Sequence, residues 1–183
     1  NTSKERTILF AGTIIKRKGY ADLIKGFAKI ANKYKDWKII MAGNGEIENA
    51  KSIAKEYGIE KQVEFPGWIK GELKEKIFQQ ASIYCLASDG EGFPMGVLDA
   101  WAYGIPCIVT PVGGLPDIVV DGKNALIFNP GDYKALSQKL DILISNDNLR
   151  TAISNASLQL AETTFNINNI NQQLGNIYRT LSK

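Results

Sequence analysis

The stretch I-Y-C-L-A-S-D-G-E-G-F-P-M-G-V-L-D-A, residues 83–100, decides the fold. Its first five residues are a continuous apolar run, which is typical of a strand buried on both faces of a parallel sheet. The glycine-rich loop that follows ends at Pro94, a residue that suits the first turn of a helix. We expect this helix to run through Leu98 to Tyr103 and to stop at Gly104.

The same strand-loop-helix unit repeats along the chain. Six apolar runs predict strands: Thr7–Ala11, Trp37–Ala42, Gln62–Phe65, Ile83–Ala87, Pro106–Thr110 and Ala125–Phe128. Between them, apolar residues at helical spacing predict stripes that face the sheet: Leu23, Phe27, Ile30, Ala31 and Tyr34; Ile47, Ala50, Ala54 and Tyr57; Leu73, Ile77, Phe78 and Ala81. From Asp132 onward the pattern is helix after helix. We therefore predict an α/β fold, a Rossmann-like doubly wound parallel sheet of about six strands with extra C-terminal helices.

The 183 residues are best interpreted as one domain, because no Pro/Gly/Ser-rich linker, repeat or low-complexity tract interrupts the pattern. Residues 1–6 are polar and have the composition of a linker. Residues 167–183 carry a last polar helix, from about Ile167 to Leu181. The sequence has neither the long apolar run of a membrane span nor the opening of a signal peptide, so we expect a cytoplasmic protein.

Composition excludes several kinds of chemistry. The chain has no histidine, which rules out Ser-His-Asp and Cys-His catalysis and His-ligated zinc. Cys85 and Cys107 sit in apolar runs and are expected to be reduced core thiols. The net charge is +3, and Lys16-Arg17-Lys18 is the one tight basic cluster. That is too little for a nucleic-acid groove, so no nucleic-acid partner is expected.

Ligands of doubly wound sheets bind outside the carboxyl ends of the strands, so the loops there are the place to look. The loop Gly12–Gly19 precedes a helix that begins near Tyr20 or Ala21, and its three cations suit a diphosphate, although a solvated charged turn explains them equally well. Trp68 can flank a base or a sugar, or cover the edge of the core. The glycine pairs at 43–45 and 113–114 permit close approach of a ligand, or are plain turns.

The loop after the fourth strand is the most informative. Glu91 stands just before the predicted helix and Asp99 lies inside it, so the two carboxylates are offset by about 7–8 Å along a ligand. The backbone N–H groups of Phe93, Met95 and Gly96 lie at the positive end of this helix, where they suit phosphate or sugar oxygens. Asp89-Gly90-Glu91 could instead form a small acidic site for Mg²⁺ or Mn²⁺.

Together these loops resemble the C-terminal domain of the GT-B retaining glycosyltransferases of group 1, also called family 4, over nearly the whole chain. The strongest element is the acidic motif E-G-F-P-M-G-V-L-D, where the family has a Glu, seven residues and a second Glu. Four further elements follow in the family's order: K-G at 18–19, G-N-G at 43–45, F-P-G-W at 65–68 and G-G-L-P-D-I-V-V-D-G at 113–122.

The resemblance implies a role for each matching position. Glu91 and Lys18 are the expected catalytic residues: Glu91 contacts the hydroxyls of the transferred sugar, and Lys18 meets the donor diphosphate. Asp99 stands where the second Glu binds the ribose hydroxyls. The other expected donor-binding residues lie in the same loops: Gly12, Thr13, Arg17, Gly67, Trp68, Gly92, Phe93 and Met95.

The implied function is transfer of a hexosyl group, with retention, from a nucleoside-diphosphate sugar to a saccharide or lipid-linked acceptor, as in polysaccharide or glycolipid assembly. No cofactor and no metal are expected. The family has two Rossmann-like domains and this chain has one. We therefore expect the donor-binding half alone, inactive by itself, with residues 167–183 packing on the N-terminal half. Contact with a membrane surface is expected only through that other half.

Three positions depart from the family's pattern. Asp99 is one methylene shorter than the usual Glu, Thr13 stands where many members carry an Arg, and Asp117 replaces another frequent Glu. Two other functions stay open at this point: half of a nucleotide-sugar epimerase, and a non-catalytic module that binds nucleotide-sugars.

Overall fold

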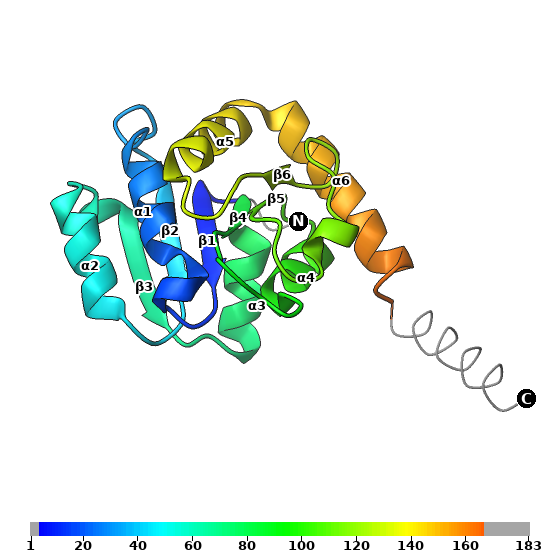
Figure 1. Cartoon of the computed structure of the whole chain (residues 1–183), viewed down its shortest axis with the longest axis horizontal. Coiled ribbons are helices and arrows are strands. Elements are labelled where there is room, and N and C mark those ends of the chain that lie inside the picture. The colour runs from blue at the N-terminus through cyan, green and yellow to red at the C-terminus, as the bar shows by residue number, and fades with distance from the viewer. Residues whose placement is uncertain (1–3, 167–183) are drawn as a thin grey trace, which may run out of the picture.

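Six parallel strands form one sheet in the order β3-β2-β1-β4-β5-β6 (Figure 1). The computed structural model describes residues 4–166. The strands are β1 Thr7–Ala11, β2 Lys38–Ala42, β3 Val63–Gly67, β4 Ile83–Leu86, β5 Cys107–Val109 and β6 Leu126–Ile127. The predicted six-stranded parallel sheet is therefore confirmed. The order reverses between β1 and β4, and such a reversal opens a crevice at the carboxyl ends of the two strands.

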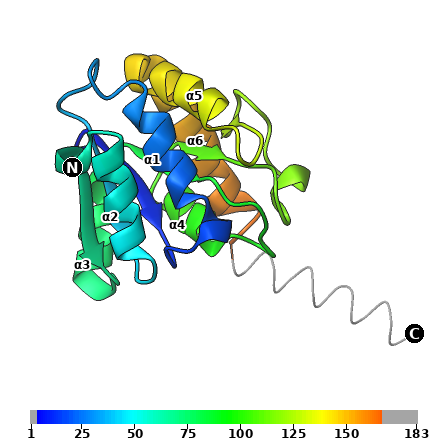
Figure 2. The same cartoon turned by 60° about the vertical axis from the view of Figure 1, so that its left-hand side comes forward.

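Helices cover both faces of the sheet. They are α1 Tyr20–Ala28, α2 Ile47–Glu56, α3 Gly71–Gln80, α4 Met95–Ala102, α5 Tyr133–Ser145 and α6 Asp147–Thr163. Helices α1, α2 and α5 pack on one face, and α5 lies beside α1 (Figures 1 and 2). Helices α3 and α4 pack on the other face, where the last turns of α6 lie against α4.

Helices on both faces of the sheet explain why the strands are largely continuous apolar runs. Along β1, Ile8 and Phe10 belong to the core under α1, whereas Leu9 belongs to the core under α4. Successive strand residues point to opposite faces, so a strand covered on both faces needs an apolar residue at every position. Cys85 and Cys107 are buried in the same way, and burial raises the pKa of both thiols, which fits their expected role in the core.

Two predicted core residues are wrong. Leu73 and Tyr57 were expected to face the sheet, but they are 47% and 39% exposed. Both lie at the ends of their helices: Leu73 in the first turn of α3, and Tyr57 just after α2. A third difference is that α1 ends at Ala28, so Ile30, Ala31 and Tyr34 pack on the core from turns rather than from a helix.

The predicted succession of helices after Asp132 is confirmed by α5 and α6. Side chains cap both: Asp132 accepts a hydrogen bond from the Ala135 N–H, and Asn146 accepts one from the Leu149 N–H. The last predicted helix, Ile167–Leu181, lies outside the described residues.

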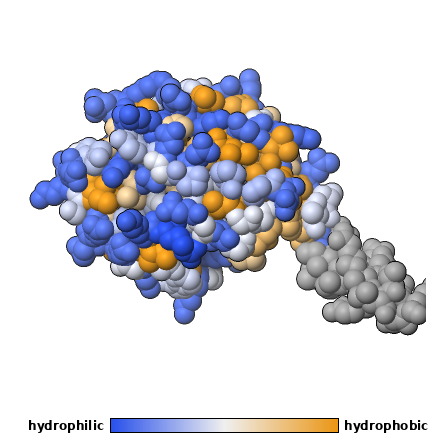
Figure 3. All heavy atoms as spheres, in the orientation of Figure 1, coloured by the Kyte–Doolittle hydropathy of each residue, from blue (hydrophilic) through white to orange (hydrophobic). Residues whose placement is uncertain are grey.

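The surface in Figure 3 is mostly hydrophilic, and its apolar side chains gather in patches, most of them on the side where α6 lies. Between residues 4 and 166, no helix combines the length and the apolar character needed to cross a bilayer.

Candidate functional site

Two adjoining hollows open at the carboxyl ends of the strands, at the reversal between β1 and β4. They share Ala11, Gly12, Trp68 and Gly96. The first hollow has a volume of about 290 Å³ and contains Lys18 and Glu91, and we name it the Glu91 hollow. The second has a volume of about 150 Å³, and we name it the Asp99 hollow; its walls include Lys74, Phe78 and Asp99.

Most of the residues predicted for the site come together here. Eight of them line one hollow or both: Gly12, Thr13, Lys18, Trp68, Glu91, Phe93, Met95 and Asp99. Glu91 and Asp99 fall in different hollows. Trp68, Phe93 and Met95 are 61%, 39% and 65% exposed, so their side chains form an open rim.

Three predicted residues, Arg17, Gly67 and Gly92, do not line either hollow. Arg17 donates a hydrogen bond to the carbonyl oxygen of Gly90. Gly67 ends β3 and pairs with Ala42 of β2. The carbonyl oxygen of Gly92 accepts a hydrogen bond from the Gly114 N–H, at 2.9 Å. Each therefore holds backbone beside the hollows. Asp117, which departs from the family's pattern, is exposed at the end of a turn of 3-10 helix, Leu115–Asp117.

An ion pair between two loops dominates the Glu91 hollow. The Lys18 ammonium lies 2.6 Å from Oε1 and 2.8 Å from Oε2 of Glu91. The side chains are 21% and 7% exposed, so this pair is largely shielded from water. Lys18 ends a turn of 3-10 helix, Lys16–Lys18, just before α1, whereas Glu91 follows β4.

The same two loops are joined through their backbones. The carbonyl oxygen of Arg17 accepts hydrogen bonds from the Asp89 N–H at 2.8 Å and from the Ser88 hydroxyl at 2.9 Å. Only one of the three adjacent cations, Lys18, lines the hollows. The Lys16 backbone N–H bonds to Glu46, and the Arg17 side chain bonds to Gly90. The three cations of the basic cluster therefore do not line the hollows together.

The Asp99 hollow holds a second lysine-carboxylate pair. The Lys74 ammonium, on α3, lies 2.8 Å from Oδ2 of Asp99, on α4. It also lies 5.5 Å from the centre of the Phe78 ring. Lys74 could not be assigned a role from the sequence, because nothing local to α3 indicates that α4 brings a carboxylate to it.

Tyr84 is another residue that the sequence analysis missed. Its hydroxyl lies beneath the Glu91 hollow and donates a hydrogen bond to the Ala11 carbonyl oxygen at 3.2 Å. Burial raises the pKa of this phenol. A Cβ added at Gly96 would lie 2.1 Å from the same hydroxyl, so Tyr84 explains why position 96 has no side chain.

Gly113 and Gly114 lie very close to the loop that carries Glu91. A Cβ at Gly113 would lie 2.1 Å from the Gly92 carbonyl oxygen, and one at Gly114 would lie 2.6 Å from the Phe93 ring. The loop after β5 thus supports the loop that carries Glu91, and neither glycine lines the two hollows.

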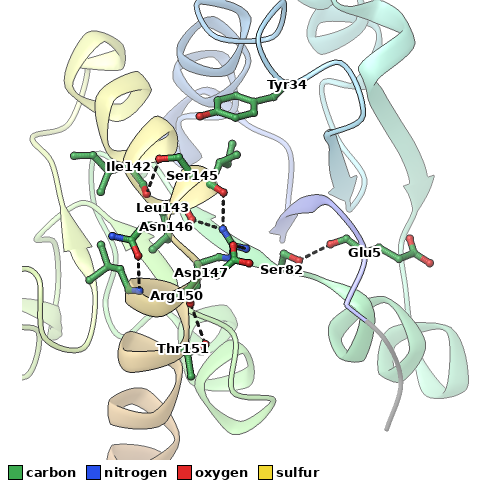
Figure 4. Close-up of polar contacts among 12 residues, drawn as sticks. Glu5, Tyr34, Ser82, Ile142, Leu143, Ser145, Asn146, Asp147, Arg150 and Thr151 are labelled. Atoms are coloured by element: carbon green, nitrogen blue, oxygen red, sulfur yellow. Dashed lines mark hydrogen bonds and ion pairs between the residues drawn. The ribbon is translucent and has the colours of Figure 1, made fainter.

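A third hollow, of about 630 Å³, lies at the opposite edge of the sheet, near the amino ends of the strands. Four of its charged groups form two ion pairs: Arg6 pairs with Asp36, and Arg150 pairs with Asp147. Arg150 also donates hydrogen bonds of 2.6 Å to the carbonyl oxygens of Leu143 and Ile144, at the end of α5 (Figure 4). We interpret this arrangement as a clamp between α5 and α6.

The acidic stretch Asp89-Gly90-Glu91 was considered for a divalent cation. Among the described residues, no group of three or more Asp, Glu, Cys or His side chains could hold a metal ion. Glu91 instead neutralises Lys18.

The chain is similar to known proteins of one family. The family model described as "Glycosyl transferases group 1" matches residues 1–159. An uncharacterised glycosyltransferase of Haemophilus influenzae is 32% identical over 161 residues, which are 87% of this chain and 45% of that protein. The chain thus spans about half the length of the curated relatives it matches.

Solved structures give the same result for the fold. The C-terminal domain of LpcC, a group 1 glycosyl transferase of Francisella tularensis, matches with a TM-score of 0.80 and 28% identity, and the match covers 88% of this chain and 86% of that one. Anabaena HepE in complex with UDP-glucose matches with a TM-score of 0.86 and 20% identity, over 96% of this chain and 49% of that one. Because the identity to HepE is only 20%, this second match shows similarity of fold alone.

Proposed function

This chain belongs to the group 1 glycosyltransferases, and from that premise we propose that it is the donor-binding half of a retaining hexosyltransferase. The donor is a nucleoside-diphosphate sugar, and the acceptor is a saccharide or a lipid-linked saccharide. The observation that carries this proposal is the pair of adjoining hollows at the reversal of strand order. Each hollow contains one carboxylate of the acidic motif, and each carboxylate is paired with a lysine.

The Glu91 hollow is the proposed place of the diphosphate and the hexose. Lys18 supplies the positive charge for the phosphates, and Glu91 accepts hydrogen bonds from the sugar hydroxyls. Helix α4 begins at Met95 beside both groups, and its first N–H groups have no carbonyl partner within the helix. These N–H groups point their partial positive charge toward an anion, which adds to the attraction of Lys18.

The Asp99 hollow is the proposed place of the nucleoside. Its carboxylate accepts hydrogen bonds from the ribose hydroxyls, and its apolar wall and the exposed Trp68 cover the base. A donor laid across both hollows has its base near Trp68 and its hexose near Glu91.

The proposed reaction needs no protein nucleophile. The bond from the anomeric carbon to the leaving phosphate oxygen breaks, and the acceptor oxygen bonds to that carbon on the same face. The acceptor proton passes to the leaving phosphate. Lys18 and the start of α4 stabilise the charge that develops on the diphosphate, so no metal is needed for that purpose. Glu91 fixes the orientation of the hexose.

Acceptor binding is proposed to reside in the other half of a longer protein. The relatives are about twice the length of this chain, which leaves room for a second domain. The 183-residue chain alone is therefore proposed to bind donor without transferring sugar. Half of an epimerase and a non-catalytic binding module remain the rival functions, and assays of sugar transfer and of sugar epimerisation by the longer protein together separate all three.

Calorimetric titration of the 183-residue chain with the glucose esters of UDP, GDP and ADP tests the donor site. We expect one of them to bind, and a Lys18→Ala, Glu91→Ala double variant to bind it at least about tenfold more weakly. Lys16→Ala is the matched control, because it removes a cation of the same loop that does not line the hollows. A folded chain that binds none of the three, or a control as weak as the double variant, contradicts the proposal.

A further inference from the structure

Lys74 is the one lysine of α3 that lines the candidate site. Its ammonium reaches Asp99 across the Asp99 hollow, and the two side chains are 37% and 38% exposed. Among the residues that the structure describes, Lys74 is the only side chain hydrogen-bonded to the Asp99 carboxylate, and it bonds to Oδ2 alone. Oδ1 and the outer side of Oδ2 are left for a ligand.

The surroundings distinguish this pair from an ordinary surface ion pair. Exposed pairs hold their side chains loosely and contribute little to stability. Here Lys74 rests near the Phe78 ring, which is itself buried, and the hollow around the pair is built from Ala11, Ala42 and Ile69. The contact of its ammonium with the Phe78 ring restricts the lysine, and the lysine in turn restricts the carboxylate.

We infer that Lys74 is a positioning residue that holds the Asp99 carboxylate in place for the ribose hydroxyls of the donor, an inference that rests on the proposed function. An aspartate reaches one methylene less far than a glutamate, so its oxygens must be placed accurately to meet two hydroxyls. Fixing the side chain before the ligand arrives lowers the cost of ordering it on binding.

The positive charge has a second effect. A bare Asp99 carboxylate would repel an anionic nucleotide, and the Lys74 ammonium offsets that charge where the nucleotide enters. The arrangement repeats the one in the neighbouring hollow, where Lys18 neutralises Glu91. The two pairs differ in their proposed use: Lys18 meets the diphosphate itself, whereas Lys74 acts through Asp99.

The test compares a ribonucleotide with its analogue that lacks both ribose hydroxyls. UDP and 2′,3′-dideoxy-UDP are titrated into four proteins: the wild-type chain, Lys74→Met, Lys74→Arg and Lys76→Met. If GDP or ADP binds better than UDP, that nucleotide and its dideoxy form are used instead. Methionine keeps most of the stem near Phe78 and removes the charge. Lys76, on the same helix, is exposed and does not line the two hollows, so it is the matched control.

We expect Lys74→Met to weaken UDP about fivefold and dideoxy-UDP distinctly less, because the analogue feels the lost charge compensation but not the lost positioning of Asp99. Lys74→Arg should restore most of the UDP affinity, and Lys76→Met should change neither nucleotide. Equal weakening of both nucleotides, or of neither, would overturn the role of Lys74 while leaving the donor site standing. A wild-type chain that binds none of UDP, GDP and ADP overturns the proposed function and this inference with it.

Discussion

The ammonium of Lys18 and the carboxylate of Glu91 meet at 2.6 Å, although 73 residues separate them in the sequence. The contact joins the loop after β1 to the loop after β4, on the two sides of the point where the strand order reverses. Because both groups are largely shielded from water, each depends on the other for its charge compensation. A donor that uses both groups must therefore replace this contact with its own phosphates and hydroxyls.

Removing one partner of this pair should cost more than removing both. We expect Lys18→Met or Glu91→Gln to lower the free energy of unfolding by about 1–2 kcal/mol, with part of the loss recovered in the double variant. Urea unfolding of the four proteins gives the coupling energy. Strictly additive effects would mean that the pair contributes nothing to stability.

The support beneath the Glu91 loop should be sensitive to one methyl group. Gly113 has a φ of +62°, and a Cβ there would meet the Gly92 carbonyl oxygen at 2.1 Å. Gly113→Ala should destabilise the chain by at least about 2 kcal/mol and weaken nucleotide binding.

Gly122 is the control for that substitution. Its φ is +75°, but a Cβ there would meet nothing within 4 Å. Gly122→Ala should therefore show only the backbone cost, about 1 kcal/mol, with unchanged nucleotide affinity. If the two alanine variants behave alike, contact with the Glu91 loop is not what position 113 requires.

A second close approach can be tested with a compensating change. Gly96→Ala places a Cβ against the buried Tyr84 hydroxyl and should lower stability and nucleotide affinity. Tyr84→Phe removes that hydroxyl, so the double variant should be more stable than Gly96→Ala alone. A double variant no better than Gly96→Ala would show that the hydroxyl is not the obstacle.

Some features of the chain could be predicted from its sequence, and others could not. The strands and helices could be predicted because their apolar patterns are local and both faces of the sheet are covered. Leu73 and Tyr57 were wrongly predicted to face the sheet, because the helical pattern does not show where a helix extends beyond the sheet. Lys74 and Tyr84 were not predicted as site residues, for another reason. Their roles come from contacts with residues that lie 25 and 73 positions away in the sequence.

The loss of folding stability at acid pH should depend on Asp141. Hydrogen bonds from Lys33, at 2.6 Å, and from Tyr34 lower the pKa of this carboxyl below its usual 3.8. A carboxyl whose pKa is lower in the folded state adds stability above its unfolded pKa and loses it as the pH falls through the folded value. Wild-type stability should thus decline below about pH 4, and this part of the decline should be absent in Asp141→Asn.

Chemical denaturation at pH values between about 2 and 6 measures this dependence. Glu56→Gln is the control, because Glu56 is exposed on α2 and makes no ion pair among residues 4–166. An Asp141→Asn variant that loses stability with the wild-type slope would contradict the assignment.

The central claim, a donor site at the carboxyl edge of the sheet, is tested most directly by the tryptophan signals of the chain. The three tryptophans report on three places: Trp68 lines both hollows of the site, Trp37 lines the hollow at the opposite edge, and Trp101 is buried in the core. Their indole N–H resonances are followed by NMR while the glucose esters of UDP, GDP and ADP are added. We predict that one ester shifts the Trp68 resonance at saturation and leaves the Trp37 resonance in place. A shift of Trp37 without Trp68 would place the ligand at the other edge of the sheet and contradict the account.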